Sequence, residues 1–155
     1  MVMLNSLFQQ VPRQVRHSVL EVKALRVCAE MDKEINMSTI TQVLEELMKQ
    51  EGALCVALVD SSSGMMLGHA GGGINMEVAA AANTEVVRAK LKAMRALGMN
   101  DKIEDILITL GKQYHILHPL SNKEDVFLYG VFDRQHANLA LARLKAKEVE
   151  KDLTF

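Results

Sequence analysis

The sequence predicts an α/β fold of the α+β type, a three-layer α/β/α sandwich on a five-stranded antiparallel sheet. Its elements follow the order α-β-β-α-β-β-β-α. At least two strand segments, including 53–60, are apolar on both faces and need cover from both sides. The last three strands are joined by the short turns "GKQ" and "SNKED", which suit an antiparallel meander. Helices must therefore cover both faces of the sheet.

The first 37 residues differ in pattern from the rest. After Pro12, the segment "RQVRHSVLEVKALRVCAEMDKEI" is rich in helix formers. Its apolar residues point nearly all round a helical wheel, so a helix here needs burial on several sides or a partner. We expect a helical extension over 1–37 and a separate domain over 38–155. The sequence leaves open whether Met37 is instead the true start, with the upstream residues an over-long gene prediction.

The first half of the domain reads as a helix followed by a hairpin. Thr39 and Gln42 have capping-box spacing, which predicts that a helix begins there, and Gly52 closes it. The apolar run 53–60 predicts a buried strand. "SSSG" is a turn, and "MMLGHA" is a weaker returning strand.

The second half begins with a long helix over 76–97, which Gly98 and Asn100 stop. Three strands follow, predicted over 102–110, 114–120 and 126–133. A final helix is expected from an Asp133 cap to about Leu153.

The 76–97 helix has two apolar faces, nearly opposite each other on the wheel. One is expected to dock on the sheet of its own chain, and it consists of Val78, Ala82, Val86, Ala89, Ala93 and Leu97. The second would be exposed in a monomer, which soluble proteins usually avoid. It predicts a homodimer interface formed by Ala80, Thr84, Val87, Leu91 and Met94, with Ile106 and Ile108 of the next strand extending the sheet across the two-fold axis.

The charged arc between these two faces is the predicted partner-binding surface. It consists of Glu77, Glu85, Arg88, Lys92 and Arg95.

The second apolar face of the 76–97 helix has an alternative explanation that needs no dimer. Another element of the same chain, such as the N-terminal helix, covers it.

Composition narrows the class of protein. With 18 basic and 19 acidic side chains the formal net charge is −1, which argues against nucleic acid as the main partner. Cys28 and Cys55 make neither a disulfide framework nor a metal knuckle, so we expect a reducing cytoplasm. Nowhere do 18 apolar residues run together, so no membrane span is expected.

Each candidate catalytic or metal-binding motif lacks a residue or a geometry that its chemistry requires. The glycines 71–73 resemble a phosphate-binding loop but lack its lysine, and Glu77 opposes an anion at the helix start. His115 and His118 are three apart in a strand, so they point to opposite faces and cannot share a metal. We predict no catalytic residue, no cofactor and no metal site. The pattern favours an interaction module over an enzyme.

Residues 38–153 resemble the roadblock family of dynein-associated light chains. The resemblance rests on the element order, on "EGALCVALVDSSSGMMLG" as the first hairpin and on "AAAANTEVVRAKLKAM" as the central helix. "ILITLGKQYHILHPL" and "VFLYGVFDRQHANLALARLK" match the closing meander and helix. The resemblance implies a homodimer whose central helices and third strands pair, and which regulates or scaffolds a small Ras-like GTPase. Relatives include a bacterial protein that accelerates GTP hydrolysis by a gliding-motility GTPase.

Two other functions fit the same layered shape. One is a small-ligand sensor similar to GAF or PAS-like domains, although the strands have no inward polar cluster to line a pocket. The other is a passive assembly adaptor that binds partners without altering nucleotide turnover.

Overall fold

The computed structural model describes residues 13–153, so the first twelve residues of the expected extension lie outside it. The chain divides into two compact units, Met1–Asn36 and Met37–Phe155. The first helix, α2 (Arg13–Met48), runs without a break from one unit into the other. The prediction that a helix begins at Thr39 is therefore wrong. No glycine or proline interrupts residues 13–48, so the capping-box spacing lies inside a continuous helix.

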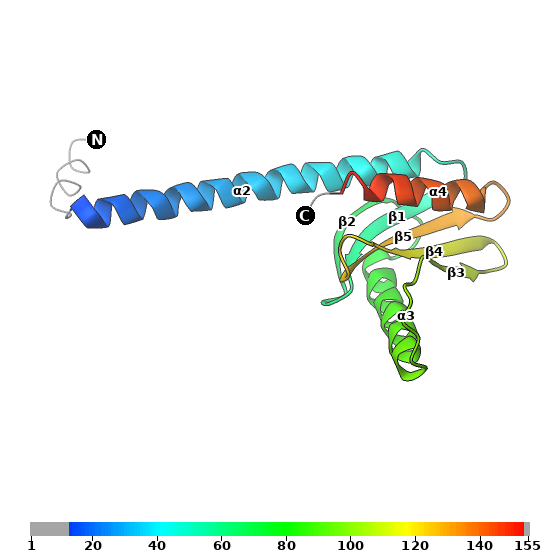
Figure 1. Ribbon diagram of the computed structural model, residues 1–155. Coiled ribbons are helices and arrows are strands. Elements are labelled where there is room, and N and C mark those ends of the chain that lie inside the picture. Colours follow the sequence, from blue (N-terminus) through cyan, green and yellow to red (C-terminus); the bar gives the residue numbers. More distant parts are fainter. Residues whose placement is uncertain (1–12, 154–155) are drawn as a thin grey trace. The chain divides into compact units, whose positions relative to one another are not determined.

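The second unit contains a five-stranded sheet in which every neighbouring pair is antiparallel (Figure 1). The strand order is β2-β1-β5-β4-β3. The strands are β1 (Ala53–Asp60), β2 (Met65–Gly71), β3 (Ile106–Thr109), β4 (Gln113–Pro119) and β5 (Val126–Asp133). The pairing of β1 with β2 shifts register between Leu58 and Val59. β2 and β3 are thus the two edges of the sheet.

Helices cover both faces of the sheet, which confirms the three-layer prediction. On one face lies α3 (Met76–Ala96), packed on a core that includes Ala57, Leu117 and Tyr129. On the other face lie the last turns of α2 and α4 (Leu139–Glu150), as Figure 1 shows. Their core includes Leu44 and Val149. β5 is buried from Val126 to Phe132 and β1 from Cys55 to Val59, as their apolar runs predict.

Apart from α2, the elements that differ most from their predicted bounds are β3 and the last helix. β3 has four residues rather than the nine expected over 102–110. The last helix begins at Leu139 with Asn138 as its cap, whose side chain accepts a hydrogen bond from the Leu141 N–H at 3.2 Å. Asp133 ends β5 instead, and its carboxylate accepts from the N–H of Gln135 at 2.9 Å. This carboxylate stabilises a turn rather than a helix end.

The glycine-rich loop between β2 and α3 allows the backbone to turn from the hairpin to the helix. Gly71 has φ +79°, and a Cβ there would lie 2.3 Å from the carbonyl oxygen of Leu54 on the neighbouring strand. Only glycine fits such a close approach. The loop then reaches Asn75, which caps α3 by accepting from the Val78 N–H at 3.1 Å. The loop returns the chain from the hairpin to the helix.

Candidate functional site

Of the two apolar faces of α3, the one expected to be exposed is buried and the one expected to be buried is exposed. Ala80, Thr84, Val87 and Met94, assigned above to a dimer interface, are buried against the chain's own sheet. This correction has a physical reason: the face with Val87, Leu91 and Met94 carries the bulkier side chains and therefore buries more apolar area. Burying the one hydroxyl group on this face costs little free energy, because Thr84 Oγ1 donates a hydrogen bond to the Ala80 carbonyl at 2.9 Å.

The face expected to dock on the sheet is instead exposed, and we call it the outer α3 face. It consists of Val78, Ala82, Val86, Ala89, Ala93 and Leu97. Val78 is 64% exposed and Leu97 is 71% exposed. Three alanines separate the larger side chains, so another helix could approach the backbone of α3 closely. The outer α3 face is an apolar stripe without cover in the described chain.

Three other residues of the predicted interface lie at the rim of the core beneath α3. Leu91, Ile106 and Ile108 are half-buried, and all three pack on the same hydrophobic cluster. Ile106 and Ile108 belong to β3, which is an edge strand. An edge strand presents unpaired N–H and C=O groups on its outer side. This rim therefore combines partly covered aliphatic side chains with free backbone hydrogen-bonding groups.

A short charged segment holds the β3 edge to α4. Arg143 binds Asp105 in a two-pronged ion pair, Nε to Oδ2 at 2.8 Å and Nη2 to Oδ1 at 3.0 Å. The hydrogen bond to Asp105 raises the pKa of Arg143. Lys147 adds a more exposed contact to Glu104 at 3.0 Å. These charges immediately precede β3, which accounts for its short length.

The charged arc of α3 is exposed, as a partner-binding surface would have to be. Glu77, Glu85, Lys92 and Arg95 all lie at the surface. Arg88 is also exposed but is already engaged, because Nη1 contacts Glu85 at 2.7 Å and Nη2 donates to the Ser62 carbonyl at 2.7 Å. The structure thus places Arg88 as a tether to the β1–β2 turn.

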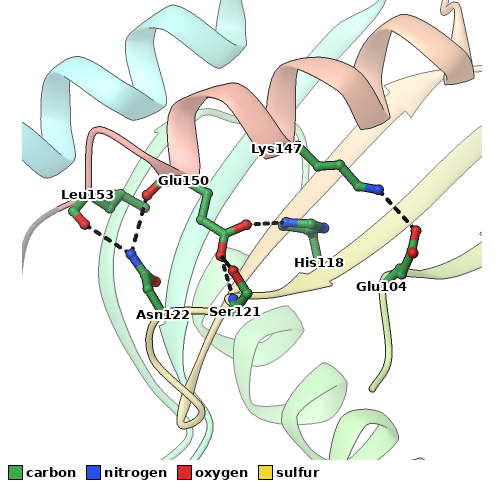
Figure 2. A network of polar contacts seen from close by, with 7 residues as sticks. All are labelled: Glu104, His118, Ser121, Asn122, Lys147, Glu150 and Leu153. Carbon is green, nitrogen blue, oxygen red and sulfur yellow. Dashed lines mark hydrogen bonds and ion pairs between the residues drawn. The ribbon is translucent and has the colours of Figure 1, made fainter. Parts of the chain in front are cut away.

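A buried polar network joins β4 to the end of α4 (Figure 2). His118 Nε2 lies 3.0 Å from Glu150 Oε2, and both side chains are almost fully buried. Ser121 donates to Glu150 Oε1 through both its N–H and its hydroxyl. Burial raises the pKa of Glu150, but the hydrogen bonds from Ser121 and His118 outweigh it, so the net pKa lies below its ordinary value. Asn122 extends the network to the Leu153 carbonyl at 3.3 Å.

This network contains a serine, a histidine and a carboxylate, but in an order that disfavours nucleophilic catalysis. In a hydrolytic triad the histidine lies between the serine and the carboxylate and removes the serine proton. Here Glu150 lies between Ser121 and His118. No hydrogen bond joins the serine to the histidine among the described contacts. The network acts as a polar clamp between β4 and α4, and the sequence gives no sign of it because its members are about 30 positions apart.

A second polar cluster lies beneath α3. The Tyr129 hydroxyl is 2.8 Å from His115 Nδ1, and burial, opposed by a hydrogen bond with Asn83, raises the Tyr129 pKa to about 12. Burial also lowers the pKa of His115. His115 and His118 thus lie on opposite faces of β4, as predicted. Cys55 is a buried free thiol whose pKa is raised by burial; the side chain of Cys28 lies outside what the structure describes.

Within residues 13–153, no group of three or more histidine, cysteine, aspartate or glutamate side chains is placed to hold a metal ion. Over the same residues, no helix is both long enough and apolar enough to cross a bilayer.

The comparisons with known proteins identify the fold. No protein-family model matches the chain, and no curated protein matches it. MglB of Myxococcus xanthus is 25% identical with a TM-score of 0.68, over 76% of this chain and 86% of that one. The gliding protein MglB of Thermus thermophilus is 21% identical with a TM-score of 0.66, over 76% and 87%. A Roadblock/LC7 domain of Streptomyces avermitilis is 11% identical with a TM-score of 0.64, over 72% and 92%.

Proposed function

Because the chain has the roadblock/LC7 fold, we propose that it is a non-enzymatic homodimer that binds a small Ras-like GTPase and modulates its GTP hydrolysis. The observation that carries the proposal is the uncovered apolar outer α3 face. The β3 edge of the sheet, which presents unpaired backbone groups on its outer side, adds a second surface for pairing. Such a surface supports binding to another protein. The resemblance to bacterial GTPase regulators of this fold supports the choice of partner.

The homodimer uses the outer α3 face and the β3 edge together. When two β3 strands pair across a two-fold axis, their outer N–H and C=O groups bond to each other and join the two sheets. The partner's chain then covers the half-buried Leu91, Ile106 and Ile108. Val78, Val86 and Leu97 replace the buried Val87 and Met94 as the helical part of the interface.

The GTPase binds the charged arc of α3 in this proposal. Glu77, Glu85, Lys92 and Arg95 present both signs of charge to solvent, which suits a specific and reversible contact. In this proposal no side chain of the regulator acts as a nucleophile, because the partner GTPase holds the nucleotide and the attacking water. The regulator acts by changing the shape or dynamics of its partner.

Val86→Glu tests the dimer. Val86 lies on the outer α3 face, so a buried carboxylate at the interface is expected to weaken association while the fold stays intact. Ala81→Glu is the matched control, because Ala81 is an exposed small residue of the same helix outside that face. Light scattering measures the mass of each variant. A wild-type protein that remains a stable monomer, or equal effects of the two substitutions, contradicts the proposal.

Measurements of GTP turnover test whether a Ras-like GTPase is the partner and whether its hydrolysis rate changes. The wild-type protein is added to Ras-like GTPases from the same genome, beginning with any encoded beside this gene, and phosphate release is measured. A changed rate that Lys92→Glu or Arg95→Glu abolishes supports regulation through the charged arc. Binding with unchanged turnover identifies a passive adaptor instead. Stabilisation by a metabolite without any GTPase response identifies a ligand sensor.

A further inference from the structure

The leading segment of α2, residues 13–36, is a helix whose described apolar side chains have no cover. Val27 is 54% exposed, and Val22 (50%) and Leu25 (69%) are exposed on other sides of the same helix. The segment forms a compact unit separate from the domain. It extends about 36 Å at 1.5 Å per residue. Helices gain most of their stability from packing rather than from propensity, so a helix of this kind requires a partner.

One side of the segment has the spacing of a coiled-coil seam. In the sequence, Leu20, Ala24, Val27 and Met31 follow one another at intervals of four, three and four. Ala24 and Val27, at the middle of this series, are exposed. Lys23 and Glu30 border the same side of the seam two turns apart, and both are exposed as well. This arrangement matches a two-helix interface with flanking charges.

The charges along the segment favour a second copy of the same chain, running in the opposite direction. Residues 13–26 contain four basic and one acidic side chain, for a net charge of +3. Residues 27–36 contain three acidic and one basic side chain, for a net charge of −2. In an antiparallel pair, the basic half of each helix lies along the acidic half of the other. A parallel pair would place like charges together over both halves.

We propose that residues 13–36 form an antiparallel helix pair between two copies of this chain, which is a self-association site distinct from the outer α3 face. The two-fold axis of the pair passes between Leu25 and Arg26, so Ala24 of each copy packs on Val27 of the other. Lys23 and Glu30 flank this central layer on the same side of the seam. In the antiparallel arrangement each Lys23 therefore lies beside Glu30 of the second copy.

A charge-swap series on the full chain tests this pairing. All variants contain Val86→Glu, so association through the outer α3 face is removed or was never present, and the readout depends on the leading segment alone. Sedimentation equilibrium at low salt is expected to show a dimer for this background protein. Lys23→Glu or Glu30→Lys turns two attractive pairs into repulsive ones and should weaken association by about tenfold or more.

The double swap Lys23→Glu with Glu30→Lys should restore association, because the opposite charges again face each other. Mixing the two single variants should restore it as well. Arg26→Glu is the matched control, because it makes the same change of charge at an exposed position outside the seam and should have a smaller effect. Circular dichroism checks that each variant keeps its helix content.

Three results would overturn the proposal. The first is a background protein that sediments as a monomer. The second is a Lys23→Glu effect no larger than that of Arg26→Glu, or one that neither the double swap nor the mixture reverses. The third is unchanged self-association together with loss of GTPase binding, which would assign the segment to that partner. None of these results depends on whether the dimer through the outer α3 face exists.

Discussion

At the scale of single residues, the glycine-rich loop shows how one backbone position determines a connection. Gly71 and Gly72 are neighbours with different surroundings. A Cβ on Gly71 would meet the Leu54 carbonyl oxygen and the Cys55 Cα, while a Cβ on Gly72 has no neighbour within 4 Å. Only Gly71 of these two combines a positive φ with close approach to the next strand.

Gly71→Ala should therefore lower the free energy of unfolding by about 2 kcal/mol or more. Gly72→Ala should leave it within about 0.5 kcal/mol of the wild type. Denaturant titration of both variants at one protein concentration measures the difference. Equal effects would show that the strand below Gly71 moves freely to accommodate a methyl group.

The clamp around Glu150 contributes stability that depends on pH. Its pKa in the folded protein lies below the ordinary value of 4.5, so folding favours the charged carboxylate. That contribution is complete above about pH 4.5 and is lost as the pH falls through the folded-state pKa.

Glu150→Gln should lower the free energy of unfolding by about 2 kcal/mol at pH 7, because the amide accepts fewer hydrogen bonds from Ser121 and His118. The gap between the wild type and this variant should shrink as the pH falls below about 4.5. Chemical denaturation of both proteins from pH 3 to pH 7 measures this difference in the free energy of unfolding. Glu148→Gln, on the exposed side of the same helix, serves as the control and should show little loss at any pH. A gap that stays constant with pH would contradict this account.

At the scale of elements, the sequence predicts the buried strands well and the edges poorly. β1 and β5 begin and end where expected because each is an unbroken apolar run between turn residues. β3 is shorter than predicted because charged residues before it are bound to α4. Local signals also mislead at helix starts, since Thr39 lies inside a helix and Asn138 caps α4 in place of Asp133.

The candidate site is predictable only in part. The wheel shows that α3 has two apolar faces, but spacing alone does not decide which one the chain's own sheet covers. Side-chain size was the signal that could have decided it. The polar clamp lies beyond sequence reasoning, because only the fold brings His118 to Glu150, 32 positions away.

Val86 and Val87 provide a direct test of the two faces of α3. Val87 is 3% exposed and Val86 is 37% exposed. Val87→Ala should lower the free energy of unfolding by about 2 kcal/mol at every protein concentration, because it leaves a cavity in the core. Val86→Ala should act only through weaker dimerisation, so its cost should vary with protein concentration. Denaturant titrations at two concentrations separate the two effects, and the reverse pattern would restore the assignment of the faces predicted from the wheel.

At the scale of the whole molecule, the sequence order of elements is enough to predict the layered fold, and the similarity to MglB and Roadblock/LC7 structures confirms it. The order of elements does not predict how copies of the chain associate. Two uncovered apolar surfaces lie on different units of one chain, the outer α3 face in one and the exposed seam residues Ala24 and Val27 of α2 in the other. If both bind second copies, folding and association are linked.

Thermal stability should then depend on protein concentration. A tenfold increase should raise the melting temperature by about 2–4 °C, because mass action favours the associated native state. Calorimetry across that range measures the shift. The Lys23→Glu, Val86→Glu double variant should show no such dependence, and a wild-type melting temperature that does not vary with concentration would mean that neither surface binds a second copy.

The β2 edge limits how far assembly through the sheet can extend. Pairing of two β3 strands leaves one β2 at each outer end of the joined sheet. There the register shift at Leu58 and Val59 and the glycines Gly68 and Gly71 make the strand an irregular template for a further β-strand. Growth by strand addition is therefore self-terminating after two chains. The strand with the weakest signal in the sequence thus keeps the joined sheet itself from extending into an open-ended fibre.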